Sequence, residues 1–302
     1  MSDAELERVV AEIRRLDPTG VRIASVLRNT LDQLYDGQHT GRYRLDQLHK
    51  TEKTHCGTLV EINLHREFKF ADGATMDYEV AGIEVDCKYS QSQFGWMIPN
   101  EAMGHLCFLV WANDELSRWS FSIVRIAETM LNHGGNRDQK RTIKAEARES
   151  IQPIFENEEL PPNILLHLPP DKLAEVMGMT SGQRKINHIF RVAQRQRIGR
   201  GVIATLGQQS DYMKRLRDNG GARSMLRPEG IIILGEYAEH KRIAQELGLP
   251  VPGEGESVGV RVAPAAEPGT GVAQIGEGLW RVATDDDPPT DAPVVPYHAA
   301  RD

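Results

Sequence analysis

The segment from Asp77 to Lys88 constrains this chain more than any other, because it combines a strand pattern with charges that a fold must accommodate. Residues 78–80 and 83–89 alternate polar and apolar side chains, as half-buried strands do, and Ala81-Gly82 lies between them as a turn. A tight two-residue turn pairs Tyr78 with Val85, Glu79 with Glu84, and Val80 with Ile83. We therefore predict a β-hairpin, although a three-residue loop with a bulge would shift the pairing.

In the tight-turn register, two carboxylates oppose each other. Asp77 falls opposite Asp86, and period-two geometry puts both on one face with Lys88, while Cys87 points into the core. Like charges that face each other destabilise a sheet, so a positive group is expected between them. A divalent cation held by Asp77 and Asp86 would provide it, because hard cations bind carboxylate oxygens, and the carbonyl of Cys87 could complete the ligands. The alternative is a merely solvated acidic face, which is the commoner arrangement on such a hairpin.

A helix is predicted before the hairpin, from Thr54 or Gly57 to Phe68. Glu61 borders its apolar stripe, and a carboxylate beside a buried face is either paired or takes part in chemistry. Hydrolysis of a phosphodiester needs an activated water, neutralisation of the phosphoryl charge and help for the leaving oxygen. We therefore expect magnesium on the carboxylates, with Glu61 holding a second ion or relaying water. The candidate catalytic set is Glu61, Asp77, Asp86 and Lys88.

The charge distribution favours a nucleic-acid partner, although the net charge of −7 argues against one. Residues 184–227 hold eleven lysines and arginines against two aspartates, a local excess of about +9, which is typical of a surface that binds polyanions. Basic side chains that only solvate helices are the alternative. The candidate DNA contacts are Arg42, Lys50, Lys53, Lys214, Arg215, Arg217, Arg223 and Arg227.

The cysteines and the hydropathy indicate the cellular compartment of the protein. Cys56, Cys87 and Cys107 lack the paired spacing of a metal site and fit a reducing compartment, and Cys87 is expected to be a buried thiol. No apolar run is typical of a signal peptide or long enough to span a membrane, so a cytoplasmic protein is expected.

The order of elements predicts two domains. Residues 1–153 are expected to form an α/β (α+β) domain with a mixed sheet, residues 154–162 a linker rich in glutamate and proline, and residues 163–302 a second domain. The second domain is expected to be a winged helix-turn-helix. Its expected elements are helices at 183–195, 199–206 and 210–218 and a hairpin in which 225–226 and 231–234 flank residues 227–230. Residues 36–41 are expected to be a loop, and residues 285–302 a loose or extended tail.

Several blocks resemble the NaeI-type restriction endonucleases, a type II (type IIE) family, over nearly the whole chain. They are residues 30–38, 46–54, 57–68, 85–88, 220–224, 226–235 and 249–252. The arrangement of Asp77, Asp86 and Lys88 is also similar to the PD-(D/E)xK nuclease pattern, although Met76 stands where that pattern has proline.

The resemblance implies an N-terminal PD-(D/E)xK endonuclease domain, a C-terminal winged-helix (CAP-like) DNA-binding domain, magnesium and a homodimer. It implies cleavage of both strands of a G/C-rich palindrome, with GCCGGC as the expected sequence, and a second bound DNA copy as activator. The family's active-site residues correspond here to Glu61, Asp77, Asp86 and Lys88. Leu34 occupies a place where the family is similar to a ligase motif but carries leucine instead of lysine, so ligation is not expected.

Two other functions remain open at this point. One is a winged-helix regulator with an inactive nuclease-like domain, which explains the basic segment but not the intact carboxylate set. The other is a repair nickase that uses the same residues on mismatched DNA.

Overall fold

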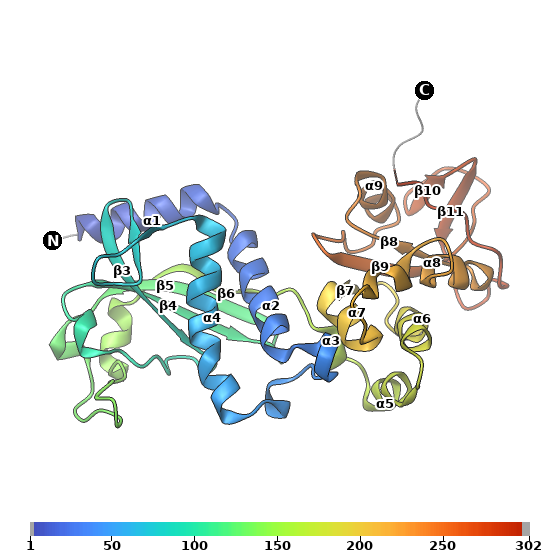
Figure 1. Cartoon of the computed structure of the whole chain (residues 1–302). Coiled ribbons are helices and arrows are strands. Elements are labelled where there is room, and N and C mark those ends of the chain that lie inside the picture. The colour runs from blue at the N-terminus through green and yellow to red at the C-terminus, as the bar shows by residue number, and fades with distance from the viewer. Residues whose placement is uncertain (1–2, 298–302) are drawn as a thin grey trace. The chain divides into compact units, whose positions relative to one another are not determined.

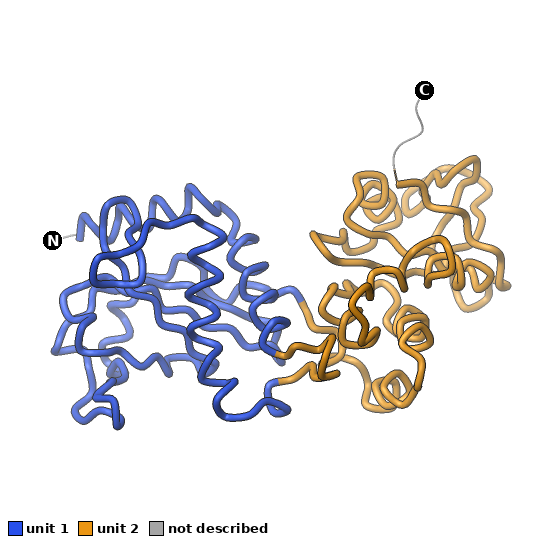
Figure 2. The backbone as a smooth tube through the Cα atoms, viewed as in Figure 1, with its two compact units in different colours: residues 1–34, 45–161 blue, residues 35–44, 162–302 orange. Residues whose placement is uncertain are grey.

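The computed structural model describes residues 3–297 of the chain as two compact units. The first unit comprises residues 1–34 and 45–161, and the second comprises residues 35–44 and 162–302, as Figure 2 shows by colour. Residues 35–44 thus fold with the second unit although they lie between two helices of the first. None of the helices formed by the described residues is long and apolar enough to cross a membrane.

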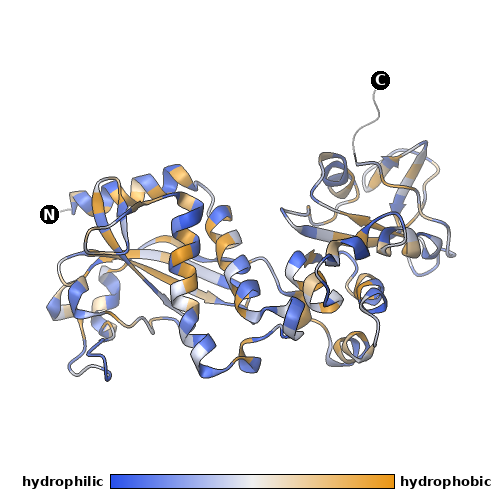
Figure 3. Cartoon of the chain, in the orientation of Figure 1, coloured by the Kyte–Doolittle hydropathy of each residue, from blue (hydrophilic) through white to orange (hydrophobic). Residues whose placement is uncertain are grey.

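The first unit is built on a six-stranded mixed sheet in the order β1-β2-β3-β4-β5-β6 (Figure 1). Its strands are β1 (Ala71–Asp72), β2 (Tyr78–Val80), β3 (Ile83–Ser90), β4 (Leu106–Asn113), β5 (Arg118–Arg125) and β6 (Gln152–Glu159). The β3–β4 pair is parallel, and the other pairs are antiparallel. The residues of β4 are buried almost throughout, which fits its continuous apolar sequence and its central place (Figure 3). The predicted mixed α/β architecture is confirmed.

The predicted hairpin is present with the tight-turn register. Tyr78 pairs with Val85, Glu79 with Glu84 and Val80 with Ile83. Both turn residues have positive φ, 53° at Ala81 and 74° at Gly82, as a type I′ turn requires. The bulged alternative is thereby excluded, and Asp77 and Asp86 face each other beyond the last paired residues.

Three long helices accompany this sheet: α1 (Ala4–Leu16), α2 (Val21–Tyr35) and α4 (Lys50–Phe68). Helix α4 packs on β3 through its buried stripe of Val60, Leu64 and Phe68. It begins earlier than expected because the Glu52 carboxylate accepts a hydrogen bond from the His49 amide and caps the first turn. A buried ion pair between Arg28 of α2 and Asp114, in the turn after β4, fixes α2 to the sheet.

Two expectations for the first 162 residues were wrong in detail. The expected loop contains a short helix, α3 (Gly37–Thr40). Most of the expected linker is strand β6, which pairs with β5. Its one proline, Pro153, and its glutamates are tolerated because β6 lies at the edge of the sheet, where one row of backbone groups has no strand partner and the side chains can reach water.

The second unit combines short helices with a five-stranded sheet. The helices are α5 (Pro170–Gly178), α6 (Gly182–Val192), α7 (Arg200–Gly207), α8 (Ala222–Leu226) and α9 (Ala238–Glu246), together with α3. The strands are β7 (Arg197–Gly199), β8 (Ile231–Leu234), β9 (Glu256–Pro264), β10 (Val272–Ile275) and β11 (Gly278–Val282). Strands β7 and β8 both pair antiparallel with β9.

Two expectations for the second unit were also wrong, and a third was wrong in part. The helix expected at 210–218 is a 3₁₀ turn over Tyr212–Leu216, and Asp211 provides no side-chain cap for it. The expected hairpin around 227–230 does not form, because residues 222–226 are helical and β8 pairs with the distant β9. The segment after Asp285 is not loose where it is described, since Ala292 and Val295 are buried in the same apolar cluster as Ile232. Residues 298–302 of that expected tail lie outside the described residues.

Candidate active site and nucleic-acid interface

The candidate active site lies on the hairpin, where Lys88 contacts three acceptors. Its ammonium group donates to Asp86 Oδ1 at 2.6 Å, to the Cys87 carbonyl at 2.9 Å and to Asp77 Oδ2 at 3.4 Å. Asp77 Oδ2 also accepts a hydrogen bond from the Cys87 amide at 2.7 Å, which ties the residue before β2 to β3. The structure thus brings Asp77, Asp86 and Lys88 together, as the strand periodicity predicts.

Burial and the close contact of Asp86 and Lys88 shift the pKa values of both side chains. Asp86 is 5% exposed, and burial raises its pKa to about 6 against the opposing effect of the Lys88 ammonium. Burial works to lower the pKa of Lys88, but the Asp86 carboxylate outweighs it and the net pKa rises. Lys88 is therefore charged at neutral pH. The site holds a cationic donor beside two acids in a largely desolvated place.

Glu61 approaches this group from α4. Its main-chain carbonyl accepts a hydrogen bond from the Tyr78 hydroxyl at 2.8 Å, which joins the middle of α4 to β2. Burial and the Asp77 carboxylate raise the pKa of the Glu61 side chain, while Lys88 opposes them. The Glu61 carboxylate therefore lies within electrostatic range of the three hairpin residues.

The oxygen donors of the hairpin decide whether the site suits a divalent ion. Among residues 3–297, no three His, Cys, Asp or Glu side chains converge in a metal-binding geometry. The Lys88 ammonium instead contacts the three groups expected as ligands: the Asp77 carboxylate, the Asp86 carboxylate and the Cys87 carbonyl. These are the hard oxygen donors that magnesium prefers, and a positive charge already lies among them. The residues present fit the ion.

The structure also shows a neighbour of Asp86 that the sequence analysis missed. The Cys107 thiol of β4 lies 3.8 Å from Asp86 Oδ2, because the parallel register places Cys107 directly beside Asp86. The hairpin pattern carries no information on its parallel neighbour, so only the register of β3 and β4 reveals this contact. Cys87 is 4% exposed, which confirms that it is a buried thiol, and burial raises its pKa.

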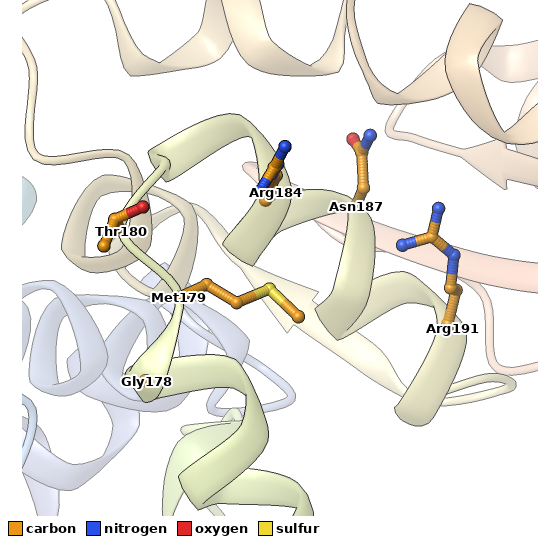
Figure 4. Close-up of a pocket in the computed structure, with 6 residues that line it drawn as sticks. All are labelled: Gly178, Met179, Thr180, Arg184, Asn187 and Arg191. Atoms are coloured by element: carbon orange, nitrogen blue, oxygen red, sulfur yellow. The ribbon is translucent and has the colours of Figure 1, made fainter.

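A pocket of about 500 Å³ opens beside α6 in the second unit. It is lined by Gly178, Met179 and Thr180 and by three side chains of α6: Arg184, Asn187 and Arg191. Figure 4 shows the α6 side chains along one side of that helix, with Thr180 on the preceding loop. Arg191 forms a bidentate ion pair with Glu229. Arg184 is exposed, so this pocket presents a cationic group to solvent.

The candidate DNA contacts divide by their surroundings. Lys50, Lys214 and Arg217 are exposed, and the side chains of Lys214 and Arg217 each expose 59% of their surface beside Asp211. Arg42, Lys53 and Arg215 are half-buried, and Arg215 donates to the Gln209 side chain.

Two of the candidates, Arg223 and Arg227, donate hydrogen bonds to backbone carbonyls of the second unit. Arg223 donates to the carbonyls of Leu216 and Ile233, and Arg227 donates to the carbonyl of Ala292. These two guanidinium groups brace the backbone around α8 rather than extending into solvent, which residue type and spacing do not reveal.

Comparisons with known proteins bear on both units. The family described as "Restriction endonuclease NaeI" matches residues 7–291. The protein named "Type II restriction enzyme NaeI" from Lentzea aerocolonigenes is 50% identical to this chain over 306 residues, which cover 99% of this chain and 96% of that protein. The match therefore includes the hairpin, the helix that precedes it and the basic segment of the second unit.

Proposed function

The chain belongs to the NaeI family of restriction endonucleases, and from that premise we propose that it cuts both strands of the palindrome GCCGGC with magnesium at Asp77 and Asp86. It is a type II restriction endonuclease, a DNA-binding hydrolase of phosphodiester bonds. Enzymes of this type generally depend on a divalent metal. The cluster of Asp77, Asp86 and Lys88 on one hairpin is the observation that carries the proposal.

Each residue of the site has a role in hydrolysis. Bound magnesium would polarise the scissile phosphate and lower the pKa of a water molecule. Asp77, Asp86 and the Cys87 carbonyl would hold the ion. Lys88, which stays charged, neutralises a non-bridging oxygen or orients the attacking water. Glu61, whose pKa is raised by burial and by Asp77, can accept a proton from that water or hold a second ion.

The first unit would be a PD-(D/E)xK nuclease domain. Its mixed sheet carries Asp77 just before β2 and the Asp86-x-Lys88 pair on β3, preceded by the helix with Glu61. This order of a helical glutamate, a single aspartate and a strand with Asp-x-Lys supports the assignment, despite Met76 in place of proline.

The second unit would be a winged-helix domain that binds the activating DNA copy. Helices α6, α7 and α8 surround a small sheet in which β7 and β8 flank β9, a topology typical of winged helices. Its exposed cations at Lys214, Arg217 and Arg184 would contact phosphates, together with the half-buried Arg215. In the first unit Lys50 and Lys53, at the start of α4, would do the same, and so would Arg42 of the second unit.

We further propose a homodimer, because a two-fold symmetric protein matches a palindromic site. The alternative of a regulator with an inactive nuclease-like domain is not supported by the family membership. A nickase acting on mismatches would leave single-strand breaks, which the plasmid digestion described next would reveal.

One digestion tests activity, site and activation together. Plasmids with one and with two GCCGGC sites are incubated with the enzyme and magnesium, and the fragment ends are mapped. We expect double-strand ends at GCCGGC, faster cutting of the two-site plasmid, and acceleration of the one-site plasmid by a duplex oligonucleotide carrying the site. Ends at another sequence would overturn the site, and equal rates would overturn the activation.

A matched pair of variants tests the active site. Asp86→Ala removes a proposed ligand and should lower the cleavage rate at least 100-fold while DNA binding in a gel-shift assay stays within a few-fold. Glu79→Ala removes an exposed carboxylate from the same hairpin and should cut normally. Undiminished cleavage by the Asp86 variant would refute the assignment.

A further inference from the structure

The two oxygens of the Asp86 carboxylate have different surroundings. Oδ1 accepts the hydrogen bond from Lys88, on the side of the candidate active site. Oδ2 lies 3.8 Å from the Cys107 sulfur, within reach of a thiol hydrogen bond. Cys107 is 0% exposed and belongs to an apolar cluster with Leu109 and Val124, so Oδ2 faces the interior of the unit.

A carboxylate oxygen in such a place needs a donor. Burying a charged oxygen without a hydrogen bond costs free energy, and the carboxylate lowers that cost by rotating toward any donor it can find. A thiol is a weak donor, but a charged acceptor strengthens the bond. The register supplies the donor reproducibly, because Asp86 and Cys107 are direct partners in the parallel β3–β4 pair.

We propose that Cys107 is a positioning residue, whose thiol holds Asp86 Oδ2 from the buried side and thereby turns Oδ1 toward the metal and Lys88. The proposal rests on the proposed role of Asp86 as a metal ligand. Partners that hydrogen-bond to the ligands of a metal fix their orientation, and losing such a partner typically costs about 10- to 100-fold in metal affinity or activity.

The thiol also has a second acceptor, and this sets the competing explanation. The Phe108 carbonyl lies 3.5 Å from the Cys107 sulfur. If the thiol served only that carbonyl, its removal would change stability but not the metal dependence of the reaction.

Three substitutions separate these cases. Cys107→Ser keeps a donor, whereas Cys107→Ala and the better-filling Cys107→Val remove it. Cys56→Ala deletes another fully buried thiol, on α4, and is the matched control. For each variant we would measure kcat and the half-saturating magnesium concentration for cleavage. Binding of Mn²⁺ alone, followed by the loss of the free-ion electron paramagnetic resonance signal, gives a readout that does not need turnover.

We expect the Ala and Val variants to need about 10-fold more metal and to bind Mn²⁺ about 10-fold more weakly, with KM for DNA unchanged. The Ser variant should stay within about threefold of the parent protein, and so should Cys56→Ala. If the Val variant unfolds at the same temperature as the parent protein but binds metal more weakly, the effect comes from positioning of Asp86 and not from core packing. Normal metal dependence in both the Ala and Val variants would overturn the proposal, as would a Ser variant as impaired as Ala.

The failure of this proposal can be told from the failure of the proposed active site. If Asp86→Ala cuts DNA normally, the active-site assignment is lost and Cys107 with it. If Asp86→Ala is inactive while the Cys107 variants keep normal metal dependence, only the positioning role is lost. Infrared spectroscopy adds a direct check, because the S–H stretching band of Cys107 should shift in metal-free Asp86→Ala.

Discussion

The sequence predicts which face of the hairpin Lys88 occupies, and the structure adds the contacts that its side chain makes. Period-two spacing places its side chain on the face of Asp77 and Asp86, and the structure adds that its ammonium touches both carboxylates. With this charge in place, the buried Asp86 and the half-buried Asp77 can lie together without a metal ion. A divalent ion bound as proposed would therefore compete with the ammonium for the same oxygens.

Replacing Lys88 with methionine should make stability depend on metal. Without the ammonium, Asp86 stays buried with no cationic partner, and we expect the metal-free protein to lose about 3 kcal/mol of stability. Added magnesium should then raise the thermal midpoint more in the variant than in the parent protein, although cleavage should be lost. Calorimetry with and without magnesium measures both effects, and an equal response of the two proteins would contradict the shared site.

His240 of α9 should make the stability of the second unit depend on pH. Its Nδ1 accepts a hydrogen bond from the Gly235 amide at 2.9 Å, which requires the neutral ring on that side. Burial, followed by the nearby Arg223, lowers its pKa from 6.5 to about 4. Asp218 and Glu239 oppose this shift, and the rings of Tyr237 and Tyr297 pack against the imidazole. Between pH 6.5 and about pH 4, the imidazole is therefore protonated more readily in the unfolded state than in the folded state.

The sign of the pH dependence follows from this difference. Because the folded pKa is depressed, His240 costs no stability above pH 6.5, and the free energy of unfolding falls as the pH drops from about 6.5 to 4. We expect a loss of about 3 kcal/mol from this residue. In His240→Asn the amide oxygen can still accept from Gly235 without titrating, so urea unfolding of that variant should show a shallower pH slope. An unchanged slope would contradict the assignment.

At the scale of elements, local patterns predicted local pairings well and distant ones poorly. The β2–β3 hairpin was predictable to the register, because its strands alternate in polarity and are joined by two residues. The pairing of β8 was not, because its partner β9 begins 22 residues after β8 ends and α9 lies between them. Cys107 escaped prediction for the same reason, since it meets Asp86 only through the β3–β4 pair.

The hairpin turn offers a test at this scale. Ala81 adopts φ 53°, a left-handed conformation that asparagine tolerates better than alanine, and Asn-Gly is the favoured pair in a type I′ turn. We expect Ala81→Asn to stabilise the protein by about 0.5 kcal/mol without changing cleavage. Ala81→Val, which puts a β-branched residue at positive φ, should destabilise it instead. Chemical unfolding of the three proteins gives the order, and a Val variant at least as stable as Asn would contradict the turn type.

At the scale of the whole molecule, the path of the chain was the least predictable feature. A single linker was expected, yet the chain enters the second unit at Tyr35, leaves it after Arg44 and returns at Pro162. Helix α3 packs on α7, and the Tyr43 carbonyl accepts a hydrogen bond from Asn163 at 2.8 Å. Composition gives no signal for this, because residues 35–44 differ little in polarity from a surface loop.

Gly37 tests the packing of residues 35–44 within the second unit. A Cβ at this position would lie 1.9 Å from Thr205 Oγ1 and 2.8 Å from the Arg42 carbonyl oxygen, so α3 would have to move off α7. We expect Gly37→Ala to cost about 1–3 kcal/mol and to open residues 35–44 to proteolysis. Gly57→Ala on α4 meets nothing within 4 Å and should not increase cleavage by the protease. Equal protease resistance of the two variants would contradict the tight contact.

The route by which residues 35–44 join the second unit has a consequence for inheritance. A gene fragment that starts at codon 162 encodes a unit without the helix that covers α7, so one recombination breakpoint cannot transfer it whole. Exchange would need two further breakpoints, on either side of residues 35–44, inside the coding region of the other unit. Natural recombinants that exchange one unit without the other should therefore be rare, and the two units should share one evolutionary history.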